Sequence, residues 1–434
     1  MVDVDATSLT ITVVAAFFLC ALAVGGGVGG GALYMPVYVG LLNDAHLAVP
    51  LAKITTNGVA WSAFFFNLFA RHPDDSRRPL INYDVALIME PLTLIGTIIG
   101  VALNVILTSG HVLFTLVTVL GFTAYRTLEK GCKQRNKELA FLKDRAEATG
   151  ISSAPSSAVE LPSVTSQQER AALLGTETDD SSNPAPRWFP VDKFLTMVGL
   201  WVFHCACLFY AGGPFAIACG EPQEKAAIVL NFLVQLGFTL YWRRRCLNLQ
   251  EKKRNDAALL ENDFAATTTA GTGQRHLVQE NFQFGTMNTL VYPFLSGVAG
   301  VCAGALGIAG GLIKGPLMVD WGLAAQSATA TAIFMIMFTS SSTILQFVIL
   351  GRLELKISLL LWFTGFGGGL LGSKMVASVL KKFDRQSFVT FFLGFIIVAS
   401  ALCMCSVVIL QMLDIFPQPH SDKDLDYCSL AALH

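Results

Sequence analysis

Two glycine-rich stretches decide the fold of this chain: GGGVGGGALYMP at Gly25–Pro36 and ALGIAGGLIKGP at Ala305–Pro316. A constant offset of 280 positions brings their glycines and prolines into register: Gly27 with Gly307, Gly30 with Gly310, Gly31 with Gly311 and Pro36 with Pro316. Internal repeats with glycine- and proline-interrupted helices at matching positions are typical of secondary transporters. The two stretches therefore indicate that one structural unit occurs twice.

The repeat extends beyond these stretches. The offset falls to 272 where Gly96-x-x-x-Gly100 aligns with Gly368-x-x-x-Gly372, and a connection eight residues shorter in the second half explains the change. Glycines four residues apart are typical of close helix packing in membranes, and we favour that interpretation for these four. We expect two homologous four-helix repeats, each with a glycine-broken first helix, and two further helices between them.

Six glycines occupy the seven positions of Gly25–Gly31, which is more than a packing seam requires. Each disfavours a helix by about 1 kcal/mol relative to alanine. We therefore expect a break, after which the helix resumes with Pro36 or Pro316 in its first turn. Exposed N–H groups and a helix N-terminus favour an anion, so two breaks facing each other predict one central anion site. Close packing alone remains the alternative for both breaks.

The composition excludes several classes of protein. Of the 434 residues 53% are hydrophobic and 14% are charged, whereas soluble proteins carry about 25% charged residues. The net charge of −1 provides no basic field for nucleic acid. Ten apolar stretches have a length suited to crossing a bilayer as a helix: Ser8–Val24, Leu47–Phe69, Val85–Leu107, Val112–Leu128, Phe194–Ala211, Ala226–Trp242, Thr289–Leu306, Ala324–Leu350, Ile357–Val376 and Gln386–Leu413. We predict an all-α polytopic membrane protein that lies in a lipid bilayer and binds no nucleic acid.

The chain divides into six predicted segments: a first membrane repeat (1–131), a charged and disordered linker (132–192), two intervening transmembrane helices (193–243), a second linker (244–286), a second membrane repeat (287–414) and a polar tail (415–434). Within the first linker, Ala148–Pro186 is rich in Ser, Thr and Pro and cannot bury enough apolar surface to fold. Lys and Arg cluster after the second, fourth and sixth apolar stretches, so the positive-inside rule places the large linkers in the cytosol. The sequence does not distinguish the plasma membrane from an endomembrane.

The direction of the repeats is open from the sequence. The broken first and seventh elements either cross the membrane or re-enter on the side from which they came. If both re-enter, the number of crossings between the repeats is odd and the repeats are inverted. In that case KKFDR (Lys381–Arg385) lies in the cytosol and GRLELK (Gly351–Lys356) lies outside.

The chain resembles the TauE/SafE family of anion permeases, also called the sulfite exporter family. The resemblance is carried by GGGVGGGALYMPVYVGLL and by GALGIAGGLIKGPLMVDWGLAAQSATATA. INYDVALIMEPLTLIGTIIGVALNVIL and SATATAIFMIMFTSSST are similar to the plant-type branch, from which the chain departs at Glu90, where that branch has Gln, and at Lys314, where it has an apolar residue. The resemblance implies gradient-driven transport of sulfite, organosulfonates or related organic anions.

Polar side chains inside the apolar stretches are the candidate site, because such residues are costly in a bilayer. Lys53, with Thr55 and Thr56, offers a cation and hydroxyl donors beyond the first break, and Lys314 lies within the second broken segment. The alternatives are that Lys314 snorkels to the interface and that the hydroxyls bond within their own helices. The predicted substrate-binding residues are Gly27, Gly29, Gly30, Gly31, Lys53, Thr55, Thr56, Gly307, Gly310, Gly311, Lys314, Ser327, Thr329 and Thr331.

Glu90 is the predicted coupling residue. It precedes Pro91 inside the third apolar stretch, and a carboxyl group in a membrane helix is typical of proton carriers. The alternative is an interfacial Glu90 that pairs with Arg77 or Arg78. We expect a proton or a sodium ion as the coupling ion.

Catalytic patterns do not occur in the sequence. There is no Ser–His–Asp arrangement, no paired carboxylates and no His/Cys spacing suited to a metal, so we expect neither an enzyme nor a cofactor or metal. The alternative function is a membrane receptor or scaffold that acts through its cytosolic linkers. No oligomeric state follows from the sequence.

Overall fold

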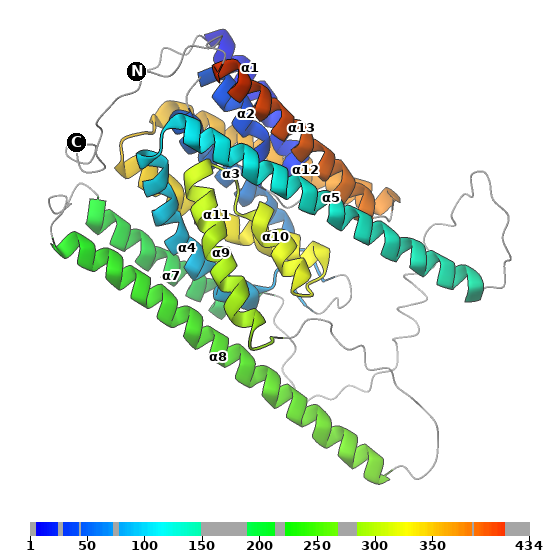
Figure 1. Ribbon diagram of the computed structural model, residues 1–434. Coiled ribbons are helices and arrows are strands. Elements are labelled where there is room, and N and C mark those ends of the chain that lie inside the picture. Colours follow the sequence, from blue (N-terminus) through cyan, green and yellow to red (C-terminus); the bar gives the residue numbers. More distant parts are fainter. Residues whose placement is uncertain are drawn as a thin grey trace.

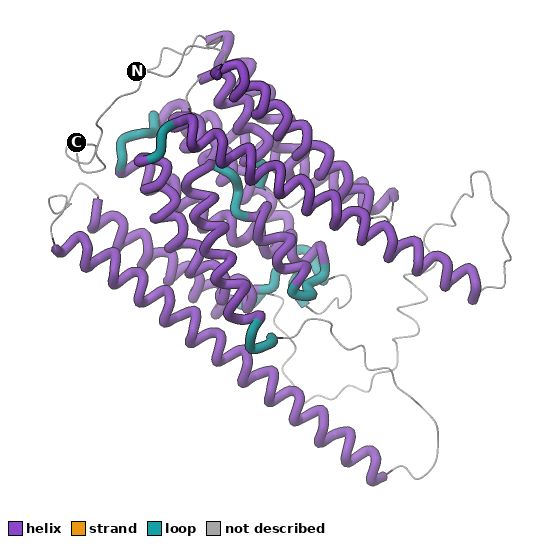
Figure 2. Tube along the Cα trace, viewed as in Figure 1, coloured by secondary structure: helices purple, strands orange, loops and turns teal. Residues whose placement is uncertain are grey.

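A computed structural model describes residues 6–24, 29–42, 45–72, 78–148, 189–212, 222–267, 284–383 and 386–412. These parts of the chain form twelve helices: α1 (Ala6–Ala23), α2 (Gly31–Leu42), α3 (Ala45–Leu68), α4 (Tyr83–Ile106), α5 (Ser109–Ala148), α7 (Val191–Gly212), α8 (Pro222–Thr267), α9 (Asn288–Leu306), α10 (Gly311–Asp320), α11 (Ala325–Ile349), α12 (Leu355–Phe383) and α13 (Gln386–Met412). Helices make up almost all of the described chain, as Figures 1 and 2 show. Of the predicted disordered segment Ala148–Pro186, Ala148 is the last residue of α5, and residues 149–186 lie outside the described residues.

The predicted fold class is confirmed. Each of the ten apolar stretches coincides with a helix, and α2 and α10 are two additional short helices that follow the breaks. Among the described residues, seven helical segments are long and apolar enough to cross a membrane: Tyr83–Ile106, Ser109–Glu129, Val191–Gly212, Lys225–Lys252, Asn288–Leu306, Gln326–Ile349 and Leu355–Met375. The chain is thus an all-α, multi-pass membrane protein. The six segment boundaries remain predictions.

Glycines in the left-handed region separate the helices at both breaks. Gly29 and Gly30 have φ values of 67° and 79°, and Gly307 has a φ of 72°, a conformation that residues with a Cβ rarely adopt. The expected place of the prolines is wrong, because Pro36 and Pro316 each lie at the sixth residue of their helix rather than in its first turn. The chain already reverses at the glycine turns, before it reaches the prolines, so the new helix begins at Gly31 or Gly311.

Both broken elements are hairpins that return toward their starting end. At the end of α10, Trp321 stacks on Tyr292 near the start of α9, with ring centroids 5.0 Å apart. In the other hairpin, the Tyr34 hydroxyl of α2 donates to the Gly29 carbonyl, and α2 packs on α1. Figure 1 shows α10 running back from the inner end of α9.

The two hairpins enter from opposite ends of the bundle. Gly96 and Gly100 of α4 face α9 in parallel register, next to Gly297 and Val301. Gly368 and Gly372 of α12 likewise face α1 in parallel register, next to Phe17 and Ala21. The helix α12 is also parallel to α3, so α1 and α3 run in the same direction. The helix α4 follows α3 after a short connection and runs in the opposite direction, and α9 is parallel to α4. Helices α1 and α9 are therefore antiparallel. The repeats are therefore inverted.

The repeats interlock: α4 of the first repeat packs on α9 of the second, and α12 of the second repeat packs on α1 and α3 of the first. Gly96 and Gly100 of α4 contact Gly297 and Val301, and Gly368 and Gly372 of α12 contact Phe17 and Ala21. The two contacted pairs are equivalent in the repeat, because they are 280 positions apart. The predicted packing role of the four glycines is thus confirmed, because any side chain there would collide with the backbone of the partner helix.

This packing yields two helix bodies that mix the repeats. The α4–α11 body consists of α4, α7, α8, α9, α10 and α11, and the α3–α12 body consists of α1, α2, α3, α5, α12 and α13. The most extensive contact between the bodies is the crossing of α3 with α11. At this crossing the Asn57 amide donates to the Met337 carbonyl at 3.2 Å and to Ser340 Oγ at 2.9 Å.

Candidate functional site

The two breaks lie directly against each other. A methyl group on Gly31 would be 2.6 Å from the carbonyl oxygen of Gly307 and 2.8 Å from the amide nitrogen of Ala309. A methyl group on Gly29 would be 2.9 Å from Cβ of Ala309. Only glycine permits this approach, so the breaks meet backbone to backbone where the two helix bodies touch.

Lys53 reaches from α3 into the break of the other repeat. Its side chain is fully buried, and its Nζ donates a 2.7 Å hydrogen bond to the carbonyl of Ile308. This carbonyl belongs to the unwound segment between α9 and α10 and lies outside the hydrogen-bond pattern of either helix. Lys53 therefore lies at the contact between the breaks, as an anion site there would require.

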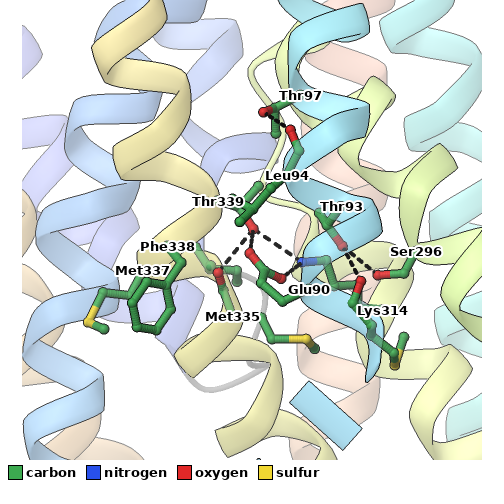
Figure 3. A network of polar contacts seen from close by, with 12 residues as sticks. Glu90, Thr93, Leu94, Thr97, Ser296, Lys314, Met335, Met337, Phe338 and Thr339 are labelled. Atoms are coloured by element: carbon green, nitrogen blue, oxygen red, sulfur yellow. Dashed lines mark hydrogen bonds and ion pairs between the residues drawn. The ribbon is translucent and has the colours of Figure 1, made fainter. Parts of the chain in front are cut away.

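Lys314 and Glu90 form a fully buried ion pair beside this contact (Figure 3). The Lys314 Nζ lies 2.7 Å from Oε2 of Glu90 and donates to Oγ1 of Thr339 at 3.2 Å. The Thr339 hydroxyl in turn donates to Oε1 of Glu90. Three helices meet here, with Glu90 on α4, Lys314 on α10 and Thr339 on α11.

Neither alternative for these two residues agrees with the structure. Lys314 is buried with no exposed side-chain surface, so it does not snorkel. Glu90 pairs with Lys314, whereas Arg78 is an exposed loop residue and Arg77 lies outside the described residues. A carboxylate and an ammonium group that are both removed from water need such a partner.

Tyr34 occupies, by the repeat register of 280, the position of Lys314 in the first repeat. Its hydroxyl lies 2.6 Å from the carbonyl oxygen of Gly29 and 2.7 Å from Oγ1 of Thr56. The neighbouring Tyr38 hydroxyl lies 2.7 Å from Oγ1 of Thr55. Both threonines also donate to carbonyls four residues back in α3, so their hydroxyls are held on the side of α3 that faces α2.

The remaining predicted residues divide into two groups. Gly310 and Gly311 form the start of α10, and a methyl group on Gly310 would touch Cε of Lys314. Ser327 and Thr331 instead tie the start of α11 to the α3–α4 connection, through the Leu80 carbonyl and the Asn82 amide. Thr329 is partly buried on the same turn, and Gly27 lies outside the described residues.

The sequence interpretation missed Tyr34, Tyr38 and Thr339. The repeat register was a signal for Tyr34, because it aligns this tyrosine with Lys314. Thr339 had no comparable signal. It is the first of five consecutive hydroxyl residues, 339–343, and only the tertiary structure shows which of them bonds to Glu90. Helix position alone does not tell which of several hydroxyls faces a charged partner.

The charges at the contact of the breaks do not cancel. With Lys53, Lys314 and Glu90 ionised, two ammonium groups and one carboxylate leave a net charge of +1 among the described buried residues there. A buried excess of positive charge is unfavourable unless an anion accompanies it. In the described part of the chain, no group of three His, Cys, Asp or Glu side chains is arranged to hold a metal ion.

Comparisons with known proteins agree with the family resemblance. The family model "Sulfite exporter TauE/SafE" matches residues 264–421. Sulfite exporter TauE/SafE family protein 1 of Arabidopsis thaliana is 26% identical over 399 residues, which cover 91% of this chain and 82% of the relative. Family proteins 2 and 3 of the same plant are 25% and 26% identical and cover 92% of this chain, and 83% and 78% of the relatives. No solved structure matches the chain. The expected resemblance is thereby confirmed.

Proposed function

We propose that this chain, a relative of the plant TauE/SafE proteins, is a secondary transporter that moves small anions such as sulfite, organosulfonates or related organic anions. The names of the relatives point to sulfite. The chemistry of the site supports the wider class, because ammonium and hydroxyl groups bind any small oxyanion. A proton or a sodium ion drives the movement.

One observation carries this proposal: two buried lysines and a single buried glutamate lie where the two breaks meet, so the three side chains carry a net charge of +1 when all are ionised. A transporter needs a site near the middle of the membrane that is incomplete without its substrate. Inverted repeats with broken helices at that depth are the arrangement in which such sites occur.

The substrate site lies between Lys53 and Lys314. Lys53 belongs to the α3–α12 body and Lys314 to the α4–α11 body, so an anion between them contacts both moving parts. The Tyr34 and Thr339 hydroxyls supply neutral donors from the same two bodies. Glu90 remains the candidate for coupling, since it is the carboxylate that pairs with one of the two cations.

Alternating access involves the two helix bodies rather than the two repeats. Because α4 and α12 each pack on the other repeat through glycine seams, neither repeat moves as a unit. The bodies instead meet mainly at the α3–α11 crossing. Rocking about this crossing opens the contact of the breaks to one side of the membrane and then to the other.

The decisive experiment measures radiolabelled sulfite and methanesulfonate uptake into liposomes that hold the purified full chain. We expect saturable uptake that depends on a proton or a sodium gradient, and a Lys314→Gln variant with weakened anion affinity. Absence of flux for every anion under both gradients contradicts the proposal. Unchanged affinity in Lys314→Gln removes this lysine from the site.

A receptor or scaffold that acts through its cytosolic linkers is the alternative. Deletion of residues 149–186 separates the two functions. A transporter retains its flux in liposomes without this segment, because the helices that bear Lys53 and Lys314 are unchanged. A scaffold has no flux in the intact chain and loses its cellular phenotype on deletion.

A further inference from the structure

We propose that Glu90 is an internal surrogate for the transported anion: its carboxylate occupies an oxyanion subsite formed by Lys314 and Thr339, and the substrate enters this subsite only when Glu90 has taken up a proton. The inference rests on the proposed function and specifies its substrate class and its coupling. One proton then accompanies each monoanion.

The geometry of the subsite is that of a receptor for two oxygens. Oε2 of Glu90 lies 2.7 Å from the Lys314 Nζ, and Oε1 accepts from the Thr339 hydroxyl. Lys314 also donates to Thr339 at 3.2 Å, which holds the two donors at a fixed spacing. Sulfite, sulfonates and carboxylates present two oxygens at a similar spacing, whereas a halide presents one atom. The subsite therefore favours oxyanions.

The inverted repeat shows that the fold does not need this ion pair. In the other half, Tyr34 stands in the register of Lys314, and Trp362 stands in the register of Glu90, with offsets of 280 and 272. These neutral residues are satisfied by neutral partners, since Tyr34 bonds to Gly29 and Trp362 Nε1 donates to Asn57. The helices of the first repeat that correspond to α10, and of the second repeat that correspond to α4, thus pack without a charged pair. The Glu90–Lys314 pair is therefore not needed for packing, which favours a role in ligand binding.

The surroundings of Glu90 single out Lys314 as its ionic partner. Around α4, the buried polar groups on α9 and α11 next to Glu90 are the hydroxyls of Ser296, which contacts Thr93, and Thr339. The nearest cation on α3 is Lys53, which is held by Ile308.

Other titratable groups on the helices around α4 have partners of their own. On α7, His204 is bonded to Ser342 and to Asn231 of α8. On α8, Arg243 bonds to Thr289, and at the start of α4 Asp84 pairs with Lys193 of α7. None of these described groups is placed to replace Lys314 as the partner of Glu90.

The exchange conserves charge and atoms. A proton from water binds one oxygen of Glu90, the neutral carboxyl releases the ammonium group, and Lys314 keeps its three protons. A monoanion then accepts hydrogen bonds from Lys314 and Thr339 in place of the carboxylate. The subsite has the same net charge before and after, and release of the anion and the proton on the other side restores the ion pair. Transport of a monoanion is thus electroneutral.

The test uses methanesulfonate, which stays a monoanion from pH 5 to pH 8, and chloride as a one-atom comparison. Binding to the purified full chain is measured by calorimetry across this range. In the wild type we expect methanesulfonate affinity to fall about tenfold per pH unit once Glu90 is ionised, since one proton is bound with each anion. Glu90→Gln, which keeps the shape and removes the charge, abolishes this slope. Chloride binds weakly to both.

Asp84→Asn is the matched control. It makes the same chemical change on the same helix, in a carboxylate that also pairs with a lysine but is about one third exposed. The pH slope of this variant stays that of the wild type. A wild-type slope in Glu90→Gln, or chloride binding as tight as methanesulfonate binding, overturns the inference.

A second measurement needs no variant and covers the case in which Glu90→Gln does not fold. Wild-type liposomes with an internal pH dye report proton entry with methanesulfonate, and a potassium–valinomycin potential reports net charge. We expect one proton per anion and no effect of the potential. Potential-driven flux without proton movement overturns the inference but leaves the proposed function standing. Absence of any anion flux contradicts the proposed function itself.

Discussion

Lys53, Glu90 and Lys314 are fully buried, and each has a partner that offsets part of the cost of leaving water. The partners differ in kind. Glu90 and Lys314 neutralise each other, whereas Lys53 is held only by the dipole of a carbonyl group among its described hydrogen bonds. A carbonyl does not cancel a full charge, so Lys53 is the residue at which an anion is expected to contribute most.

Lys53→Gln tests this expectation. The variant loses a charge-assisted hydrogen bond to the anion, which corresponds to about 1.5–3 kcal/mol, or roughly a 10- to 150-fold weaker affinity. Methanesulfonate binding to the purified protein measures the change. Lys193→Gln is the control, because Lys193 pairs with Asp84 and is partly exposed, and its affinity should equal that of the wild type. Equal affinities in all three proteins would exclude Lys53 from the site.

Gly31→Ala tests the contact between the breaks. The added methyl group meets a backbone oxygen and a backbone nitrogen at 2.6 and 2.8 Å, which cannot move aside as a flexible side chain does. Overpacking of this kind costs about 1–3 kcal/mol of stability. We expect the free energy of unfolding to fall by this amount and the flux to fall with it, because the two breaks no longer meet closely. Gly40→Ala on the same helix has open space around it and should leave the flux unchanged. The outcome that speaks against a functional contact is equal flux in both variants.

At the scale of helices, the breaks and the seams use glycine for different reasons. Gly29, Gly30 and Gly307 supply positive φ values, which the chain needs in order to reverse. Gly96, Gly100, Gly368 and Gly372 are helical and supply close approach. Both uses are visible in the sequence, because runs of glycine differ from glycines spaced by four. The helix that each seam would contact was not visible, since the contacts join residues about 200 or more positions apart.

Gly100→Ala and Gly372→Ala test the seams as a symmetric pair. In both cases the methyl group would collide with the backbone of the partner helix, with Val301 for α4 and with Ala21 for α12. We expect each to lower the free energy of unfolding in detergent by about 1–3 kcal/mol. Gly121→Ala in α5 meets open space and should be neutral or slightly stabilising. Destabilisation by Gly121→Ala equal to that of the pair would contradict the packing argument.

At the scale of the whole molecule, inversion places equivalent ends of the repeats on opposite faces. The α3–α4 connection and the start of α11 share one end of the bundle, as the bonds of Ser327 and Thr331 to this connection show. The α11–α12 connection therefore lies at the other end. The positive-inside rule assigns the first end to the cytosol, which remains a prediction.

Cysteine labelling in intact cells tests this sidedness. Arg78→Cys in the α3–α4 connection and Glu354→Cys in the α11–α12 connection are both at exposed positions. A membrane-impermeant thiol reagent should label Glu354→Cys above the background of the parent protein, and Arg78→Cys only after the cells are opened. Labelling of both from the same side would contradict inverted repeats. Reversed labelling of the two would contradict only the cytosolic assignment.

The sequence by itself determined the helices, the two breaks and the repeat, because these depend on local properties: apolar length, glycine runs and a constant spacing. It also marked Lys53, Glu90 and Lys314, because charge is rare in an apolar helix. Only the tertiary structure decided that the broken elements are hairpins, that α4 and α12 each pack on the other repeat, and that Ser327 and Thr331 lie away from the breaks. It likewise brought Lys314 to Glu90, which is 224 positions earlier in the chain. The physical reason is that a polar side chain in a membrane must find a partner, but which partner it finds depends on helix directions that no local pattern encodes.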